Sequence, residues 1–411
     1  MSTVRVGIDK IRVNPTTMSL DMDRLCAARG HDPADIHDVM MIDQRGVNPP
    51  WEDPVTMAVN AALPMLTDED KQNIELLIVG SESGVDQEKP MSTWVQRYLG
   101  LPSRCRNFEI KHACYSGTAG VMMAANLLAS PATRPNAKAL VITTDQSRMH
   151  FGKPYEFVMG AGSCALLLSR DPRFFEIELG KHGVHTHEVS DLTRPTSRVE
   201  TGNSETSLLS YLDALDNAVG DYLERLGEPI TYDYFKKNVY HVPFGGMTLR
   251  ATRAALRRFG IEGKKEARRY WEEKTEPSLA YVRRMGGTYA SSTFIALLAL
   301  VQRCEDLKAG DRVGMFSYGS GSCAEFYGGF VGPEAKKIAA QADLPGLLDA
   351  RYDATVRDYE EAERERTLWV DNGDFVPSTD GFAGLFEKQY AGKGKLVFRG
   401  CQEHYRQYAW S

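Results

Sequence analysis

The sequence predicts an α/β protein made of two related halves, and three observations support this prediction. Apolar segments of strand length alternate with segments of helical period along the chain. The 411 residues exceed what one ordinary hydrophobic core accommodates. A strand that runs into a turn of glycine and serine occurs once in each half, as "ELLIVGSESG" at 75–84 and "MFSYGSGS" at 315–322.

The first half is expected to alternate strands and helices up to Arg170. We predict strands at 4–13, 74–80, 105–113, 138–148 and 160–170, and helical segments at 34–43, 53–66 and from Ser116 onward. The strand at 74–80 ends in small residues and the acid Glu82, at the position where open α/β sheets place their chemistry. We therefore divide the chain into halves at 1–170 and 171–411.

The second half is expected to repeat this plan. A polar segment at 191–207 is predicted to be a surface or substrate-lining loop. The elements expected after it are an amphipathic helix at 208–226, a turn and basic helix at 239–260, a loop and small-residue helix at 286–307, a strand–turn–strand unit at 311–331, a charged surface helix around 357–367, and a last strand with an aromatic tail at 395–411.

Composition limits the classes of partner and compartment. Hydrophobic residues make up 42% and charged residues 25%, as in ordinary globular proteins, and the net charge of -6 gives no general reason to bind nucleic acid or a membrane. There is no run of eighteen apolar residues and no basic, then apolar, leader at the start. Seven scattered cysteines without a CxxC pair are expected to be reduced thiols, so we expect a cytoplasmic protein.

Cys114, in "KHACYSGTAG", stands between a short strand and a small-residue helix. A buried cysteine is usually an inert small hydrophobe. At a helix N-terminus, however, the positive end of the backbone dipole and the unpaired N–H groups lower a thiol pKa and favour the thiolate. The position therefore predicts either a packed thiol or a nucleophile.

Two further residues supply the proton handling that a thiolate nucleophile needs. Glu82 follows an apolar strand in "SESGVD", and His241 stands in "YHVPFGG". Taken alone, Glu82 reads equally well as a solvated carboxylate and His241 as an ordinary turn residue. With Cys114, and with backbone N–H donors from Gly321 and Ser322 in the Gly-rich turn, they make up an acyl-transfer and condensation site.

The ordered motifs "SESGVD", "ACYSGTAG", "HVPFGGM" and "YGSGS", followed after Cys323 by "AEFY", resemble the 3-hydroxy-3-methylglutaryl (HMG) synthases of the thiolase superfamily. The resemblance implies a five-layered αβαβα thiolase fold of two duplicated halves, a homodimer, and no permanently bound cofactor or metal. It implies that Cys114 takes an acetyl group as a thioester, that Glu82 removes a proton from that group, and that His241 polarises the β-ketone of the second substrate. We expect Tyr318, Phe244 and Tyr289 to be packing residues or pocket walls.

The resemblance is greatest to the branch that works in polyketide β-branching cassettes. Enzymes of primary isoprenoid metabolism, which use coenzyme A thioesters, typically carry a lysine where this chain has Gly246. The β-branching enzymes take substrates from donor and acceptor acyl carrier proteins, on a phosphopantetheine arm. Arg250, Arg253, Arg257 and Arg258 recur at helical spacing after His241, which predicts a basic stripe for an acidic carrier or an ordinary solvated face.

Two departures bear on the substrate. Gly287 replaces the asparagine of the family's "GN-Y" motif, which removes a side-chain donor near the reacting carbonyl. The segment 149–162, which covers the acyl pocket in the family, is shorter than is usual. Acetyl is the donor expected from the family, and these departures make propionyl the alternative.

The segment "HGVHTH" contains His182, His185 and His187 at spacings that could line one face. No carboxylate or cysteine partner is evident in the sequence, so we expect no metal site. The leading prediction is a carrier-dependent synthase that produces a 3-hydroxy-3-carboxymethyl thioester through an acyl-cysteine. The alternatives are the coenzyme A-dependent HMG synthase and a catalytically impaired relative that only docks carriers.

Overall fold

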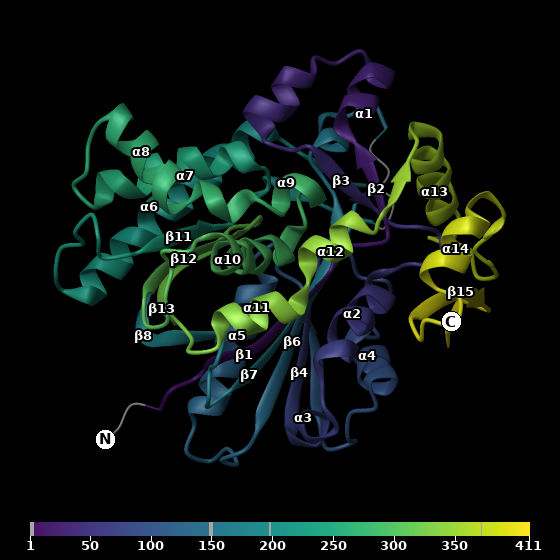
Figure 1. Ribbon diagram of the computed structural model, residues 1–411, viewed down its shortest axis with the longest axis horizontal. Helices are drawn as coiled ribbons and strands as arrows, with labels where there is room; N and C mark the ends of the chain where they lie inside the picture. Colours follow the sequence, from purple (N-terminus) through teal and green to yellow (C-terminus); the bar gives the residue numbers. More distant parts are fainter. Residues whose placement is uncertain (1–3, 148–150, 197–198, 371) are drawn as a thin grey trace.

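The structure, a computed structural model, describes residues 4–147, 151–196, 199–370 and 372–411. Its centre is a nine-stranded mixed sheet in the order β11-β12-β13-β8-β1-β7-β6-β4-β5 (Figure 1). Its strands, in that order, are β11 (Lys237–Tyr240), β12 (Arg312–Gly319), β13 (Cys323–Val331), β8 (Phe175–Thr186), β1 (Gly7–Asn14), β7 (Ala161–Ser169), β6 (Lys138–Gln146), β4 (Ile74–Gly80) and β5 (Arg106–Ile110).

Strand β1 joins the two parts of this sheet. On one side it pairs antiparallel with β7, from Gly7 opposite Ser169, and on the other it pairs briefly with β8, where Gly7 faces Glu176. A Cβ at Gly7 would lie 2.1 Å from the carbonyl oxygen of Phe175. Only glycine therefore fits where the strands of the two halves meet.

The strand directions bring polar loops from both halves to one region. In the first half β4 runs parallel to both β5 and β6. In the second half β11 runs parallel to β12, and β13 runs antiparallel to both β12 and β8. Because the carboxyl ends of parallel strands meet at one edge of a sheet, the segments that follow β4 and β6 lie together.

Helices cover both faces of the sheet and one fills the centre of the molecule (Figure 1). Helix α10 is buried from Ser292 to Val301, which fits its uniformly apolar sequence. The α-helices are α1 (Met22–Arg29), α2 (Pro54–Ala62), α3 (Asp68–Asn73), α4 (Met91–Leu99), α5 (Ser116–Ala129), α6 (Ser204–Leu226), α7 (Gly245–Arg258), α8 (Lys264–Lys274), α9 (Val282–Met285), α10 (Ser292–Arg303), α11 (Ala335–Ala342), α12 (Leu344–Asp349), α13 (Val356–Leu368) and α14 (Ala383–Gln389).

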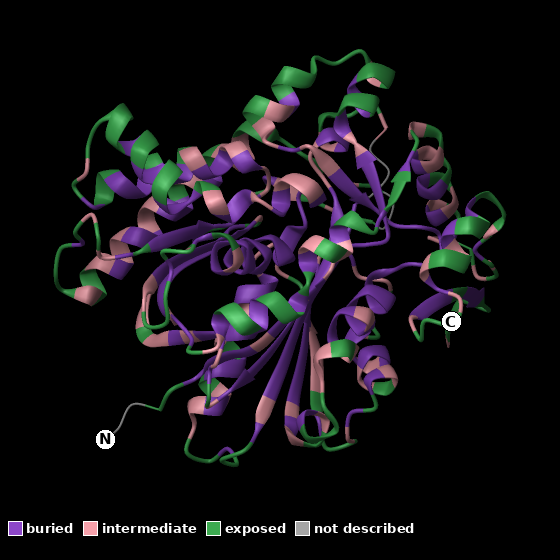
Figure 2. Cartoon of the chain, in the orientation of Figure 1, coloured by how far each residue is buried: buried purple, intermediate pink, exposed green. Residues whose placement is uncertain are grey.

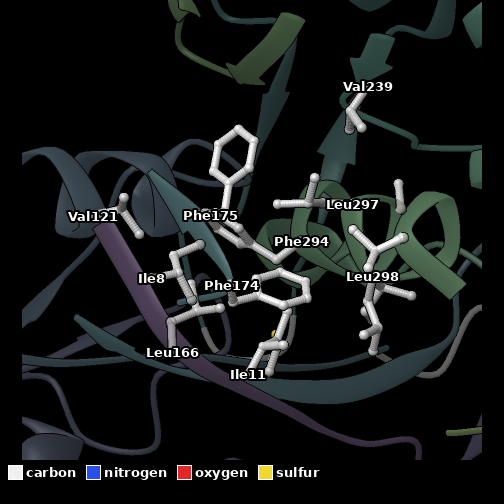
Figure 3. Packing of buried hydrophobic residues seen from close by; sticks show 14 of the residues in the cluster. Ile8, Ile11, Val121, Leu166, Phe174, Phe175, Val239, Phe294, Leu297 and Leu298 are labelled. Atoms are coloured by element: carbon white, nitrogen blue, oxygen red, sulfur yellow. The ribbon is translucent and has the colours of Figure 1, made fainter. Parts of the chain in front are cut away.

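The largest hydrophobic cluster unites both halves. Figure 3 shows Ile8, Leu166 and Phe174 close to Phe294 and Leu297 of α10. Buried residues run through the central strands, while exposed residues gather on the outer helices and loops (Figure 2). Within the described ranges, no helix combines the length and the hydropathy that crossing a bilayer requires.

Smaller sheets complete the fold. The three-stranded sheet contains β14 (Tyr352–Ala354), β2 (Met18–Asp21) and β3 (Gln44–Val47); β9 (Leu192–Thr193) pairs with β10 (Thr201–Gly202), and β15 (Leu396–Gln402) with β16 (Tyr405–Trp410). The predicted aromatic tail is thus the second strand of a hairpin. Its Arg406 and Tyr408 each place a donor 2.7 Å from Asp53 Oδ2, at the start of α2.

Helix α13 differs in part from the predicted solvated surface helix. One of its faces is buried, and it carries Glu363 at 1% exposure and Arg366 at 5%. Arg366 is ion-paired with Glu363 and donates to the side-chain oxygens of Asn48 and Gln146. The charged residues of this segment therefore form a buried ion pair on one face of α13 and a solvated surface on the other.

Candidate active site

Cys114 lies in the tight connection between β5 and α5. Ala113, directly before it, has a φ of 41°, a left-handed conformation that is uncommon outside glycine and concentrates at functional sites. The start of α5 packs closely on the sheet, since a Cβ at Gly117 would lie 2.5 Å from Cγ2 of Thr143. The small residues after Cys114 therefore bring its thiol against the strand ends.

Glu82 reaches Cys114 from the neighbouring strand end. Its loop follows β4, and the Sγ atom of Cys114 lies 3.5 Å from Glu82 Oε2, within hydrogen-bonding distance for sulfur. Both side chains are only partly exposed. The geometry permits the thiol proton to pass directly to this carboxylate.

Asp145 holds the Glu82 loop in place, and the sequence analysis missed it. Its Oδ1 accepts hydrogen bonds from the backbone N–H of Glu82 at 2.9 Å, from Ser81 Oγ at 3.0 Å and from Ser83 Oγ at 2.9 Å. Asp145 lies near the end of β6, which runs parallel to β4. The sequence did contain a signal for this role, since Asp145 is an acidic residue near the end of the predicted strand 138–148.

Arg194, from the predicted substrate-lining segment, contacts the same loop. It donates to the carbonyl oxygen of Glu82 at 2.7 Å and to Glu200 Oε2 at 2.6 Å. The segment does line the site, although Ser197 and Arg198 within it lie outside the described residues. Arg194 is thus a half-buried cation beside the proposed base.

The pKa directions at the site differ from the expectation for Cys114. Burial, with the negative charge of Asp145 as second cause, raises the pKa of Glu82 to about 8. Burial also raises the pKa of Cys114 well above its ordinary value, and the charges of Glu82 and Asp145 add to the shift. The prediction was that the helix N-terminus lowers this pKa; in the free site, burial and the nearby carboxyl groups raise it instead.

His241 enters from the second half, directly after β11. It is 2% exposed, and burial lowers its pKa to about 3, so the imidazole is neutral. Its Nδ1 lies 3.0 Å from Ser292 Oγ, and that oxygen accepts from the backbone N–H of Val242 at 3.4 Å. The Ser292 hydroxyl can donate to Nδ1, and in the tautomer that accepts this hydrogen bond the ring proton is on Nε2.

Cys114, Glu82 and His241 line one cavity of about 1000 Å³. Phe244 and Tyr318 also line it, and so do Tyr155, Val158 and Met159 of the segment 149–162. Arg148, Met149 and His150 lie outside the described residues. The cavity has the size typical of ligand sites and unites groups from both halves.

The predicted oxyanion donors are already bonded within the protein. The backbone N–H of Gly321 donates to Asp191 Oδ1 at 3.0 Å, and that of Ser322 donates to the carbonyl oxygen of His187 at 3.1 Å. Ser320, one residue earlier, is the turn residue that lines the cavity. The prediction that Gly321 and Ser322 offer free N–H groups is therefore wrong for this conformation, because the turn uses them to fix its own position.

The arginines of α7 divide into two groups. Arg250, Arg253 and Arg257 are exposed, and Arg250 lines the cavity. Arg258 forms an ion pair with Asp216 of α6. Arg258 is exposed as well, and its ion pair distinguishes it from the other three; Arg250, at one end of the predicted stripe, reaches the cavity.

Tyr289 lines the cavity, as predicted, in an unusual conformation. Its φ is 50°, a left-handed value that is an outlier for a bulky residue. Its buried hydroxyl has no hydrogen-bond partner among the described residues. Sequence reasoning had no signal for either property.

The "HGVHTH" segment acquires a partner that the sequence did not reveal. His185 and His187 lie beside Asp213 of α6, and one ligand atom from each lies within 4.8 Å of the others. His182 is not in this group. The premise that no carboxylate is available was wrong, because Asp213 is brought in by the packing of α6 on β8.

Sequence comparison relates the chain to polyketide biosynthesis 3-hydroxy-3-methylglutaryl-ACP synthase PksG of Bacillus subtilis (strain 168), with 37% identity over 370 residues, 87% of each protein. This chain belongs to the HMG synthase family. The family model described as hydroxymethylglutaryl-coenzyme A synthase C terminal matches residues 257–394. A hydroxymethylglutaryl-CoA synthase of Enterococcus faecalis is 32% identical over 357 residues, 86% of this chain and 90% of that protein.

Solved HMG synthases share the fold. The curacin biosynthetic pathway HMG synthase in complex with holo donor-ACP matches with a TM-score of 0.93 and 39% identity, over 99% of this chain and 100% of that one. PksG, described as an HMG-CoA synthase from Bacillus subtilis, matches with a TM-score of 0.93 and 34% identity over the same shares. The predicted five-layered αβαβα thiolase fold is confirmed, and this HMG synthase is an acyl-condensing enzyme.

Proposed function

We propose that this HMG synthase adds an acetyl-derived branch to the β-ketone of an intermediate tethered to an acyl carrier protein. The product is a 3-hydroxy-3-carboxymethyl thioester. The observation that carries the proposal is that Cys114, Glu82 and His241 line one cavity with Arg250 at its mouth. The first half, 1–170, supplies the nucleophile and base, and the second half, 171–411, supplies the histidine.

The first steps use the Cys114–Glu82 pair. As Sγ of Cys114 attacks the acetyl thioester, its proton passes to Glu82; the new thioester bond forms and the donor's pantetheine thiol leaves with a proton. Glu82, once deprotonated again, removes a proton from the acetyl methyl group. The raised pKa of Glu82 suits it to this exchange, because an acid that titrates near neutral pH both takes and returns protons.

His241 acts on the second substrate. Its Nε2 proton, directed by the Ser292 contact at Nδ1, donates a hydrogen bond to the β-ketone oxygen. The acetyl carbanion forms a bond to the ketone carbon, and the resulting alkoxide takes a proton to give the tertiary alcohol. Water then cleaves the thioester to Cys114, which releases a carboxylate and restores the thiol.

A charged surface beside the cavity fits a carrier protein. Arg250, Arg253 and Arg257 have no ion-pair partner in the described part of the chain. Carrier domains are acidic, so these arginines would attract one electrostatically and orient its phosphopantetheine arm toward the cavity mouth. The name of PksG, which specifies an ACP-linked synthase, and the curacin enzyme's complex with donor-ACP support this assignment.

Gly246 argues against the coenzyme A-dependent alternative. A Cβ at this position would lie 2.0 Å from the carbonyl oxygen of Val39, which lines the cavity. The lysine of the coenzyme A enzymes therefore has no room here without movement of the Val39 segment. The comparison that decides is turnover of acetoacetyl-coenzyme A against acetoacetyl carrier protein; equal or better use of the free coenzyme A substrate would contradict the proposal.

Intact-mass measurement separates catalysis from carrier docking alone. After incubation with an acetyl carrier protein, the wild type should gain one acetyl group, and Cys114→Ala should gain none. An unmodified wild type would favour the docking-only alternative. Propionyl carrier protein in the same assay shows whether the pocket, with its Gly287 departure, also takes the larger donor.

The docking surface has its own test, in which the cavity is left intact. The double variant Arg253→Glu, Arg257→Glu should raise KM for carrier substrates about tenfold at low salt and leave the turnover of a small pantetheine thioester unchanged. Arg357→Glu, an exposed change on α13, is the control. Equal effects of the double variant and the control would remove α7 from the docking surface.

We also propose that two copies associate through β5. This strand is at the edge of the sheet, and on its outer side no strand of the described chain is paired with it. An open strand edge is a template for pairing with another chain. Light scattering should give the mass of a dimer.

The seven free cysteines fit a reducing compartment, which supports a cytoplasmic location.

A further inference from the structure

His185 and His187 present two imidazoles on one side of the molecule. His185 is among the last residues of β8, and His187 directly follows the end of that strand, two positions further on. Their ring centroids are 5.3 Å apart, and His185 Nε2 lies 3.6 Å from Asp213 Oδ2. The three ligand atoms converge on a point that solvent reaches, since His187 and Asp213 are exposed.

The surrounding contacts hold these groups in place. Asn217, one turn further along α6, donates to Asp213 Oδ1 at 3.2 Å, which leaves Oδ2 turned toward His185. The main chain of His185 pairs with Ala324 in the sheet, and the carbonyl oxygen of His187 accepts from Ser322. Such outer contacts orient the ligands in protein metal sites.

We propose that His185, His187 and Asp213 form a binding site for a divalent transition-metal ion, with zinc as the first candidate. Two imidazoles and one carboxylate are a donor set that zinc uses, with the fourth position left to water. Imidazole donors favour zinc, nickel or copper over magnesium and calcium, which prefer oxygen ligands. The proposal reverses the expectation from the sequence and does not depend on the proposed condensation chemistry.

A bound ion would connect β8 to α6. The first turns of α6 contribute Ser207, Leu208 and Tyr211 to the cavity wall, and Asp213 follows directly. The Ser322 hydrogen bond ties His187 to the turn that carries Ser320, which also lines the cavity. The ion would therefore brace α6 and the Ser320 turn, and it takes no part in the bonds that form and break.

The test is a metal titration of the untagged, full-length protein. Isothermal titration with zinc chloride should show one ion per chain with a micromolar or tighter dissociation constant, and cobalt chloride should give the d–d absorption of a site of low coordination number. His185→Ala, His187→Ala and Asp213→Asn should each weaken zinc binding at least about tenfold. Asn217→Ala should weaken it less, because Asn217 only orients Asp213.

His182→Ala is the matched control, since His182 belongs to the same strand but not to the group. It should bind zinc like the wild type. Zinc should also raise the thermal midpoint of the wild type and of His182→Ala, and not that of His187→Ala. Absence of a one-to-one isotherm, or equal affinity in the wild type and in His187→Ala, would overturn the proposal.

Discussion

Glu82→Gln should stabilise the protein while it abolishes condensation. Glutamine keeps the size of the side chain and removes its ionisation. The pKa of Glu82 is about 8 in the fold, against an ordinary value of 4.5. Between these values the native state holds more protons than the unfolded state, so the free energy of unfolding falls as pH rises through this window.

The size of the effect follows from that shift. Because Glu82 ionises in the unfolded state and stays protonated in the fold, the free energy of unfolding is lowered by about 1 kcal/mol at pH 5 and about 3 kcal/mol at pH 7, as upper bounds because the side chain is partly exposed to the cavity. Below pH 4.5 the cost disappears, because Glu82 is then protonated in both states. The stability advantage of Glu82→Gln should therefore grow by about 2 kcal/mol from pH 5 to pH 7.

The assay is urea unfolding of wild type and variant at several pH values between 5 and 7.5. Any packing effect of the substitution adds a constant to the difference, so the pH dependence of the difference isolates the ionisation. A cooperative urea transition with an unchanged m-value confirms that the variant is folded. A difference that stays flat across this range would refute the raised pKa and, with it, the reasoning about the base.

Three further predictions rest on neighbouring contacts. Asp145→Asn removes the charge that raises the pKa of Glu82, so the acidic limb of the pH–rate profile of condensation should move down by about 1 unit; an upward move would contradict this. Tyr115→Phe removes the 2.7 Å donor to Glu325 and should cost about 1–3 kcal/mol in urea unfolding, whereas no loss would mean that another group satisfies that carboxyl. Arg366→Ala leaves Glu363 buried without its cation and should cost about 3–5 kcal/mol, with a smaller loss in the Arg366→Met, Glu363→Leu double variant; equal losses would assign the effect to packing.

Residues defined by local pattern were predictable from the sequence. Helix α6 was expected from apolar residues at helical spacing, and strand β4 from an unbroken apolar run before Glu82. Cys114, Glu82 and His241 followed from strand ends and turns together with the order of the motifs. These signals are carried within a few residues of each position.

Contacts between distant segments were not predictable in the same way. The hydrogen bond from Glu82 to Asp145 spans 63 positions, and that from Arg194 to Glu82 spans 112. The amide directions at Gly321 depend on Asp191, which is 130 positions away. The prediction of a lowered pKa for Cys114 failed for the same reason. The burial and the carboxyl charges that raise this pKa come from segments that meet only in the fold.

The hydrogen bond between Arg406 and Asp53 joins residues 353 positions apart. Asp53 caps α2, is fully buried, and receives its second donor from Tyr408. During synthesis this carboxylate has neither partner until the β15–β16 hairpin has been made, so the contacts at the start of α2 are complete only late. Docking of that hairpin against α2 is therefore expected to be a late step of folding, because it closes a loop of 353 positions.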